Sequence, residues 1–254
     1  MNVVRSIRTY GYLFGYLPFT IPALRKVRRI KHNASPEQLA DTVSREPRKW
    51  ATGILNRTNS DISMTIQEAL PDGPVLFVSN HEGNFDIPVL ISRLPKPFGF
   101  MSKEEVRKLP VIRKWMEEMN CVFIDRSDRR SAVRSIRDMA EKLRSGHSML
   151  IFPEGTRSRG GKPGDFKTGF VRIAKEGGVP IVPVAIHGTS SIMEQNNNRI
   201  RPAHVTVDVL EPISHQEILG RSAAEITRLI QDRIREATAE RAAEKRQQEP
   251  GRTA

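Results

Sequence analysis

The chain has 254 residues, of which 41 are Lys or Arg and 29 are Asp or Glu, giving a formal net charge of +12. This length fits one large α/β domain with appendages, and the positive charge favours an anionic partner: nucleic acid, a membrane surface or a phosphorylated substrate. The single cysteine, Cys121, excludes an internal disulfide and favours a reducing compartment.

The chain opens with an aromatic and basic segment. The apolar stretch TYGYLFGYLPFTIPAL (residues 9–24) holds all three tyrosines and is followed by the basic run RKVRRIK. Its 16 residues span about 24 Å as a helix, against about 30 Å of membrane hydrocarbon, and Pro18 and Pro22 break a single helix. Residues 1–35 are therefore predicted to form a helical element on an anionic membrane surface. The alternative is a segment that packs on the domain with a solvated basic face.

Apolar periodicity predicts alternating strands and helices after this segment. A first helix begins at Ser35-Pro36 and is disturbed at Pro47. Strands are predicted at 61–69, 75–80, 98–102, 121–125, 148–153, 179–188 and 203–213. Helices are predicted at 86–94, 104–119 with an interruption at Pro110, 131–146, 168–178 and 222–246. This alternation predicts an α/β fold with a mostly parallel central sheet flanked by helices.

The C-terminal part is predicted to be separate in character from the rest. Residues 36–212 form the main domain, and residues 213–254 form a charged helix and a tail. The apolar stripe of this helix fades out along its length, and residues 247–254 (QQEPGRTA) are predicted to be disordered. The members of the stripe are Ile226, Leu229, Ile230 and Ile234.

Charged residues follow four of the predicted strands. Because ligands of an open α/β sheet bind at the carboxyl ends of its parallel strands, these residues are expected to gather in one site. They are His81, Lys103, Arg126 and the turn Glu154-Gly155-Thr156-Arg157. Converging cations suit a phosphate monoester. The alternative pairs Arg126 with Asp125 or Asp128, and Arg157 with Glu154.

The segment NHEGNFD places His81 and Asp86 five positions apart. A neutral histidine can accept a proton from a hydroxyl, and it does so best when a carboxylate holds its other ring nitrogen. Gly83 allows the chain to curl back so that the two side chains meet. The alternative assigns Asp86 to the N-cap of the next helix, and the spacing alone favours neither.

The loop RSRGGKPGDFKTG (residues 157–169) follows the EGTR turn directly and is predicted to form a mobile flap over the site. A plain surface loop is the alternative. The sequence contains no Cys/His metal spacing and no nucleotide-binding fingerprint, so neither a metal nor a cofactor is expected.

These residues resemble the glycerolipid acyltransferases, and most closely the bacterial 1-acyl-sn-glycerol-3-phosphate acyltransferases, which make phosphatidic acid. Four family blocks occur in family order: NHEGNFD, VFIDR, FPEGTRS and VPIVPVAIHG. The resemblance covers roughly residues 60–212, which makes residues 36–212 the acyltransferase domain. It implies a membrane-associated enzyme, held peripherally or monotopically at the cytoplasmic face of the cell membrane.

The resemblance also implies roles for single residues. His81 corresponds to the catalytic base and Asp86 to its orienting partner. The residues that correspond to acceptor-binding positions are Lys103, Arg126, Glu154, Gly155, Thr156 and Arg157. Pro183 corresponds to a proline linked to acyl-donor binding or to shaping the pocket, and its alternative is a rigid turn within a strand.

The implied reaction transfers an acyl group directly from acyl-CoA or acyl-acyl carrier protein to the sn-2 hydroxyl of lysophosphatidic acid. Backbone N–H groups near Gly155-Thr156 are a hypothesis for oxyanion stabilisation. Cys121 lies inside an apolar run and is not expected to act as a nucleophile. The alternatives are glycerol 3-phosphate or another lysophospholipid as acceptor, water as acceptor, or an idle basic module that binds lipid or nucleic acid. Nucleic acid is disfavoured because aromatic and basic residues do not interleave.

Overall fold

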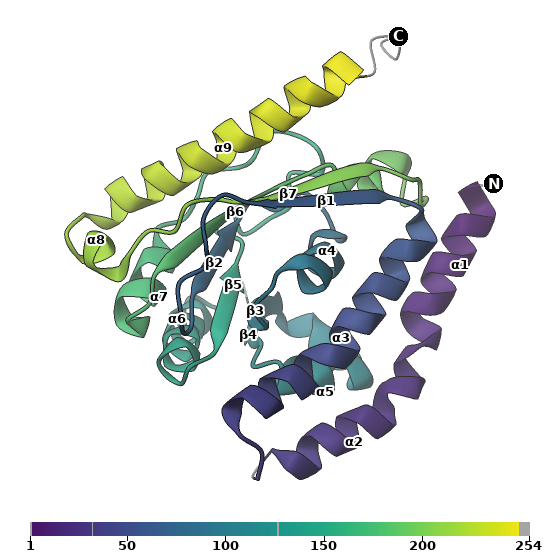
Figure 1. Cartoon of the computed structure of the whole chain (residues 1–254), viewed down its shortest axis with the longest axis horizontal. Helices are drawn as coiled ribbons and strands as arrows, with labels where there is room; N and C mark the ends of the chain where they lie inside the picture. The colour runs from purple at the N-terminus through teal and green to yellow at the C-terminus, as the bar shows by residue number, and fades with distance from the viewer. Residues whose placement is uncertain (1, 32, 126, 249–254) are drawn as a thin grey trace.

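A seven-stranded sheet forms the centre of the protein (Figure 1). The computed structural model describes residues 2–31, 33–125 and 127–248, and the strand order is β1-β7-β6-β2-β5-β3-β4. The strands are β1 (Asp61–Ile66), β2 (Leu76–Ser79), β3 (Phe98–Lys103), β4 (Val122–Ile124), β5 (Ser148–Ile151), β6 (Ile181–His187) and β7 (His204–Val209). The α/β class with a mostly parallel sheet is confirmed.

Two strands run against the other five. β6 pairs antiparallel with β7, and β1 pairs parallel with β7, whereas β6, β2, β5, β3 and β4 all run parallel. The five parallel strands therefore share one carboxyl edge, at which their following loops meet. The apolar pattern predicted β1 and β7 as strands but not their reversal, because such a pattern carries no direction.

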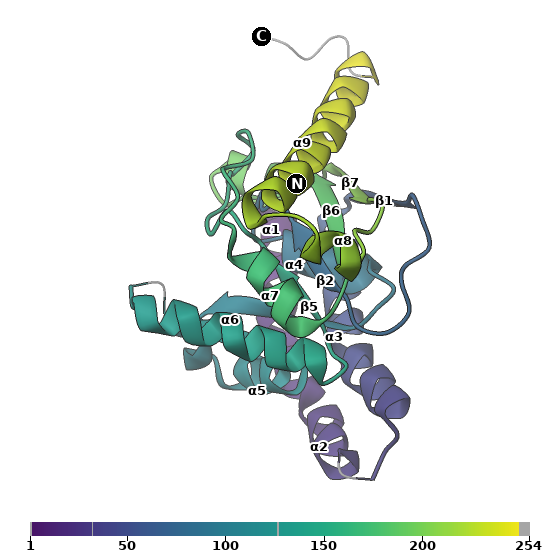
Figure 2. The same ribbon diagram turned by 90° about the vertical axis from the view of Figure 1, so that its left-hand side faces the viewer.

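Helices cover both faces of the sheet (Figure 2). Their bounds are α1 (Asn2–Gly15), α2 (Ile21–Ile30), α3 (Pro36–Thr58), α4 (Asp86–Arg93), α5 (Pro110–Glu118), α6 (Arg129–Arg144), α7 (Gly169–Gly177), α8 (His215–Leu219) and α9 (Ala223–Gln248), with short 3-10 turns η1 (Leu17–Thr20), η2 (Glu104–Lys108), η3 (Thr189–Ser191) and η4 (Glu194–Asn196). Successive residues of β2 divide the core: Phe77 packs with α3 and α4, and Leu76 packs with α6, α7 and α9. This alternation is the strand period of two.

The last helix follows its predicted apolar stripe. Ile226, Ile230 and Ile234 are fully buried against the sheet, and Leu229 is partly buried beside them. The predicted start of the disordered tail is wrong by two residues, because α9 continues to Gln248. Residues 249–254 of that predicted tail lie outside the described residues.

The first long helix begins as predicted and then passes through its proline. Ser35 forms a capping box with Gln38 at the start of α3, and the helix runs on to Thr58 with Pro47 inside it. Proline removes one backbone donor and costs about 3 kcal/mol in a helix interior. Packing on both sides of Pro47 offsets this cost, since Leu39 and Val43 before it pack against the α2–α5 cluster, and Ala51 and Ile54 after it pack into the main core.

The N-terminal helices dock on the rest of the protein through aromatic and charged side chains. α1 lies along α3, and α2 packs on α5 through Leu24, Val27 and Trp115. The Trp115 ring N–H donates to the Thr20 hydroxyl at 2.8 Å, and buried Glu118 pairs with cations of α2 and the following turn. These contacts join residues 2–31 firmly to the domain.

The chain breaks predicted at both prolines of this region are confirmed. Pro18 and Pro22 stand in the first turns of η1 and α2, where a missing N–H costs nothing. Among the helices of the described residues, none combines the length and the apolar character that a membrane crossing requires.

Candidate active site

The candidate site lies where β2 ends beside β6. The buried Asn80 side chain donates to the Ile186 carbonyl at 2.8 Å and accepts from the Ile186 N–H at 2.9 Å. This side chain thus replaces backbone pairing at the point where β2 stops. His81, the next residue, is therefore held on a rigid part of the sheet edge.

The sequence prediction that His81 and Asp86 meet is confirmed. His81 Nδ1 lies 2.5 Å from Asp86 Oδ2, and the Asp86 side chain is fully buried. Because a carboxylate only accepts hydrogen bonds, Nδ1 is the donor in this contact, and in the neutral imidazole the lone pair is then on Nε2. The His81 ring also stacks on Phe152 with a centroid distance of 4.0 Å, and it stays 17% exposed. The pair can therefore present a proton acceptor to a ligand at the sheet edge.

The alternative role of Asp86 as an N-cap is wrong. α4 begins at Asp86 itself, its N-cap position is Phe85, and no side chain caps the helix. The Asp86 carboxylate instead accepts from the N–H groups of Glu82 (2.8 Å) and Gly83 (3.1 Å), which precede it. It is used to fold the HEGNFD loop around His81, not to start the helix.

A second buried carboxylate, Glu82, fastens this loop to the end of β6. Its Oε2 accepts from the Gly188 N–H at 2.9 Å and from the amide and hydroxyl of Ser190 at 3.4 and 3.3 Å. Its Oε1 lies 3.3 Å from His187 Nδ1. Glu82 was not predicted as a site residue, although it stands next to His81 in the sequence.

Glu154 connects three parts of the site through the backbone. Its Oε1 accepts from the His81 N–H and its Oε2 from the Gly164 N–H, both at 2.7 Å. Burial raises the pKa of Glu154, and the two backbone N–H groups oppose that rise. The predicted alternative of an Arg157–Glu154 ion pair is wrong, because the Glu154 carboxylate is committed to the backbone.

Arg157 lies beside the HEGNFD loop and has other partners than Glu154. Its Nη1 donates to the Asn84 side-chain carbonyl and lies 3.6 Å from Glu194 Oε1, which in turn accepts from the Asn84 N–H at 2.7 Å. Burial raises the pKa of Glu194. The Arg157 side chain remains 30% exposed, so it can still reach an anion. No local sequence signal pointed to Glu194, which is 37 residues away along the chain.

The loop of residues 157–169 lies against the site. The N–H groups of Ser158 and Arg159 donate to the carbonyls of His81 and Glu82, at 2.8 and 2.9 Å. At its other end Phe166 is buried, and its N–H donates to Gln231 of α9 at 2.8 Å. The loop is therefore anchored at both ends, and its mobility stays a prediction.

The oxyanion hypothesis is wrong for one of its two amides. The Gly155 N–H donates to the Phe152 carbonyl at 3.2 Å, and Gly155 has φ +72°, a conformation that favours glycine. This amide serves the turn after β5. Thr156 is exposed at the same turn.

Two further cations, Lys103 and Arg126, were predicted to lie at the site. Lys103 is the last residue of β3, exposed at the same edge of the sheet, and Arg126 lies outside the described residues.

Within residues 2–31, 33–125 and 127–248, no group of three His, Cys, Asp or Glu residues is placed to hold a metal ion.

Pro183 stands inside β6 and not at a turn, so the predicted turn alternative is wrong. It is aligned with Val78 of β2, and its carbonyl accepts from the Leu210 N–H at 2.9 Å. The N–H that proline lacks would face the same side, where the β6–β7 ladder ends at Val184 and Val209. The proline therefore sits at the one end of this ladder where it costs little.

Cys121 is buried directly before β4, as its apolar setting predicted. Burial raises the pKa of its thiol to about 12. At neutral pH the group is a thiol and not the nucleophilic thiolate.

Three comparisons with known proteins all find acyltransferases. The family model described as Acyltransferase matches residues 61–187, half of the chain. A Mycoplasma genitalium protein named as a probable 1-acyl-sn-glycerol-3-phosphate acyltransferase is 32% identical over 192 residues, which are 73% of this chain and 69% of that protein. The crystal structure of the 1-acyl-sn-glycerophosphate (LPA) acyltransferase PlsC from Thermotoga maritima has a TM-score of 0.83 and 27% identity, covering 95% of this chain and 96% of the other.

The chain is shorter than its plant relatives. The chloroplastic 1-acyl-sn-glycerol-3-phosphate acyltransferase LPAT1 of Arabidopsis thaliana is 40% identical over 149 residues, which are 58% of this chain and 42% of that protein. The matched part thus spans less than half the length of that relative.

Proposed function

Because this chain belongs to the acyltransferase family, we propose that it transfers an acyl group from a thioester to the sn-2 hydroxyl of 1-acyl-sn-glycerol-3-phosphate. The product is phosphatidic acid. The observation that carries this proposal is the contact of 2.5 Å between His81 Nδ1 and the buried Asp86 carboxylate. That contact leaves Nε2 as the proton acceptor for the attacking hydroxyl.

The proposed reaction is a direct transfer. Nε2 of His81 removes the hydroxyl proton as the acceptor oxygen attacks the thioester carbonyl carbon. The carbon–sulfur bond then breaks, and the imidazolium returns the proton to the leaving thiolate. Asp86 stabilises the imidazolium while it exists, and such acid–base catalysis typically contributes about 10²–10⁴-fold. Acyl-CoA and acyl-acyl carrier protein are both donors of the required thioester chemistry.

The proposed phosphate contact is Arg157. Its guanidinium has several donors, and only Nη1 is used by Asn84 and Glu194 in the contacts described above. The other nitrogens can therefore grip two phosphate oxygens. We place Lys103, the last residue of β3, around the same phosphate. For Arg126 we propose the same role from the sequence resemblance alone.

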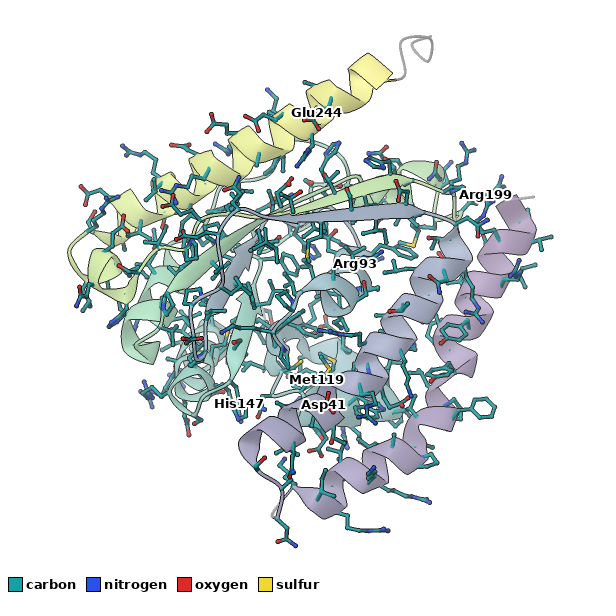
Figure 3. All side chains as sticks on the ribbon, viewed as in Figure 1. Asp41, Arg93, Met119, His147, Arg199 and Glu244 are labelled. Carbon is teal, nitrogen blue, oxygen red and sulfur yellow. The ribbon has the colours of Figure 1, made fainter. Side chains whose placement is uncertain are left out.

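An apolar cavity gives the acyl chains a place to lie. It has a volume of about 210 Å³ and lies between α3, α4, β3 and α5. Ile87, which follows Asp86 in α4, lines it together with Trp50, Phe100 and Met116. Met119, labelled in Figure 3, lines both this cavity and a groove of about 630 Å³ on the amino side of β3 and β5. We infer that a long acyl chain enters this apolar space.

We also propose that α1, η1 and α2 dock on an anionic membrane surface. Val3, Val4, Ile7, Phe14 and Phe19 are exposed, with Phe19 at 79%, and Arg25, Lys26 and Arg29 are exposed in α2. Exposed apolar side chains beside cations suit the lipid interface, and the cytoplasmic leaflet carries the anionic lipids.

The three half-buried tyrosines of this segment also contact the protein. Tyr10 donates to the Asn198 carbonyl at 2.9 Å, Tyr12 lies under the Arg57 guanidinium at 3.7 Å, and Tyr16 donates to Glu46 at 3.2 Å. The tyrosines thus face the protein. The two phenylalanines, and not the tyrosines, are the aromatic residues available to a membrane.

One experiment tests the proposed function. Purified full chain is given 1-oleoyl lysophosphatidic acid with oleoyl-CoA or with oleoyl-acyl carrier protein, and the products are identified by mass spectrometry. The proposal expects phosphatidic acid with at least one donor. Acylation of glycerol 3-phosphate alone, or release of free fatty acid without a lipid acceptor, would overturn it.

A further inference from the structure

Thr189 stands directly after β6 and faces the catalytic pair. Its side chain is fully buried, and it opens the short turn η3. The preceding Gly188 has φ +94°, and a Cβ there would collide with the His204 carbonyl, so the backbone turns sharply at this point. This turn carries Thr189 from the end of β6 to Asp86.

The Thr189 hydroxyl donates to Asp86 Oδ1. The other oxygen, Oδ2, takes His81 and the two amides of the HEGNFD loop. Among residues 2–31, 33–125 and 127–248, no other group hydrogen-bonds Oδ1. One oxygen of this buried carboxylate therefore depends on a single hydroxyl, 103 residues away along the chain.

Glu82 keeps the hydroxyl in place. Its carboxylate accepts from the amides on both sides of Thr189, those of Gly188 and Ser190, and lies 3.4 Å from the Thr189 hydroxyl. The turn that presents Thr189 is thus fastened to the residue next to His81. Movement of the turn around Thr189 would therefore displace the loop that contains His81, and the reverse also holds.

We propose that Thr189 is a positioning residue of the His81–Asp86 pair: its hydroxyl fixes the rotation of the Asp86 carboxylate and withdraws part of its negative charge. This inference rests on the proposed function only in taking His81 as the base. An Asp86 carboxylate that is fixed at Oδ1 holds the imidazole in the plane that directs Nε2 toward the acceptor.

The charge effect has a definite sign. Without the Thr189 hydroxyl, Asp86 keeps more negative charge and stabilises the imidazolium more strongly. The pKa of His81 then rises relative to that in the parent. Since His81 must be neutral to accept a proton, the acid limb of the kcat/KM profile moves to higher pH.

The test compares Thr189→Val with Thr189→Ser and with Thr206→Val in the full chain. Thr206 in β7 is a matched control, because its buried hydroxyl has no partner in the part of the chain that the structure describes. We expect Thr189→Val to lower kcat about tenfold with little change in the KM for lysophosphatidic acid. Thr189→Ser and Thr206→Val are expected to retain the parent kcat.

A second measurement does not need activity. The His81 ring is titrated by NMR in ¹⁵N-labelled protein, with its signals assigned by their loss in His81→Ala. We expect a higher His81 pKa in Thr189→Val than in the parent, Thr189→Ser or Thr206→Val. If the parent chain made no phosphatidic acid, the proposed function would fail while this titration would still decide the role of Thr189.

An unchanged His81 titration together with parent kcat in folded Thr189→Val would overturn the inference. So would loss of kcat in Thr206→Val equal to that in Thr189→Val, because the effect would then be one of packing. If Thr189→Val does not fold, Thr189→Cys replaces the hydroxyl by a weaker donor, and the same direction of shift is required of it.

Discussion

The sheet edge around His81 and the N-terminal helices are both assembled from segments far apart in the sequence, but different interactions hold them. At the edge, three buried carboxylates, those of Glu82, Asp86 and Glu154, each accept several backbone or hydroxyl donors. Along α1 and α2, apolar and aromatic packing dominates, and one apolar side is left exposed.

This difference separates the proposed catalytic site from the proposed membrane-binding surface. Buried charge is costly unless every oxygen is matched by a donor, so the edge has one defined geometry. The N-terminal helices instead expose apolar side chains beside cations, and this is the surface that we propose docks on a membrane. Replacing polar residues at the sheet edge should therefore reduce turnover. Replacing exposed apolar residues of the N-terminal helices by polar ones should reduce membrane binding alone.

The largest effect is expected from His81→Ala. Loss of the proton acceptor should lower kcat by about 10⁴-fold, measured as phosphatidic acid formed from lysophosphatidic acid. Circular dichroism and the thermal midpoint should stay near those of the parent, since the imidazole is partly exposed. Turnover at the parent rate in folded protein would remove histidine from the chemistry.

Asp86→Asn should lower kcat by about 10³-fold. The amide oxygen can still accept from the Glu82 and Gly83 amides, but the negative charge that stabilises the imidazolium is gone. Because Asp86 does not cap α4, the helix content should not change. A variant with parent turnover would make Asp86 a folding residue and would weaken the contrast between the two regions.

Arg157→Ala should raise the KM for lysophosphatidic acid by about 30-fold and leave kcat within a few-fold. The reason is the loss of charge-assisted bonds to the acceptor phosphate. Arg159→Ala is the matched control, since this exposed arginine touches the site only through its backbone. Equal KM increases in both variants would show that Arg157 acts only through the general positive charge of the surface and does not contact the phosphate.

The double variant Phe14→Ser, Phe19→Ser should weaken binding to anionic phospholipid vesicles by about tenfold in a flotation assay. Its kcat on a short-chain, water-soluble lysophosphatidic acid should match the parent. Leu219→Ser is the control, because Leu219 is similarly exposed but lies on α8. Parent-like flotation of the phenylalanine variant would place the membrane contact elsewhere on the protein.

The smallest effect is expected from Cys121→Ala, with kcat within about twofold and a free energy of unfolding lowered by about 1 kcal/mol. Both follow from burial, which keeps the thiol protonated and leaves a small cavity on truncation. A folded variant without turnover would contradict direct transfer and would imply an acyl-enzyme intermediate.

Local sequence patterns predicted most of the strands and helices and identified His81 and Asp86 as candidate site residues. Alternation predicted β1 and apolar runs predicted the other strands, whereas the His-x4-Asp spacing left open whether Asp86 meets His81 or caps the next helix. The start of α3 at Ser35 followed from its capping residues, but its passage through Pro47 did not. Propensity weighs each residue alone, whereas burial on both sides of Pro47 outweighs the proline.

The partners of the predicted residues were not visible in the sequence. Thr189, Glu194 and Gln231 contact the HEGNFD loop or the flap from more than 60 residues away. A threonine or a glutamate at such a distance carries no periodic or spacing signal. The same holds for Glu118 of α5, which pairs with Arg28 of α2 and with Lys31 in the turn after it.

The sequence alone determined which segments are strands and helices, where charged residues follow strands, and that Cys121 is buried, because these depend on neighbours along the chain. Only the tertiary structure decided that Asp86 contacts His81 instead of capping α4, and that Arg157 pairs with Glu194 and not with Glu154. The physical reason is that a buried carboxylate takes whichever donors the fold brings to it, and the fold brings them from distant segments.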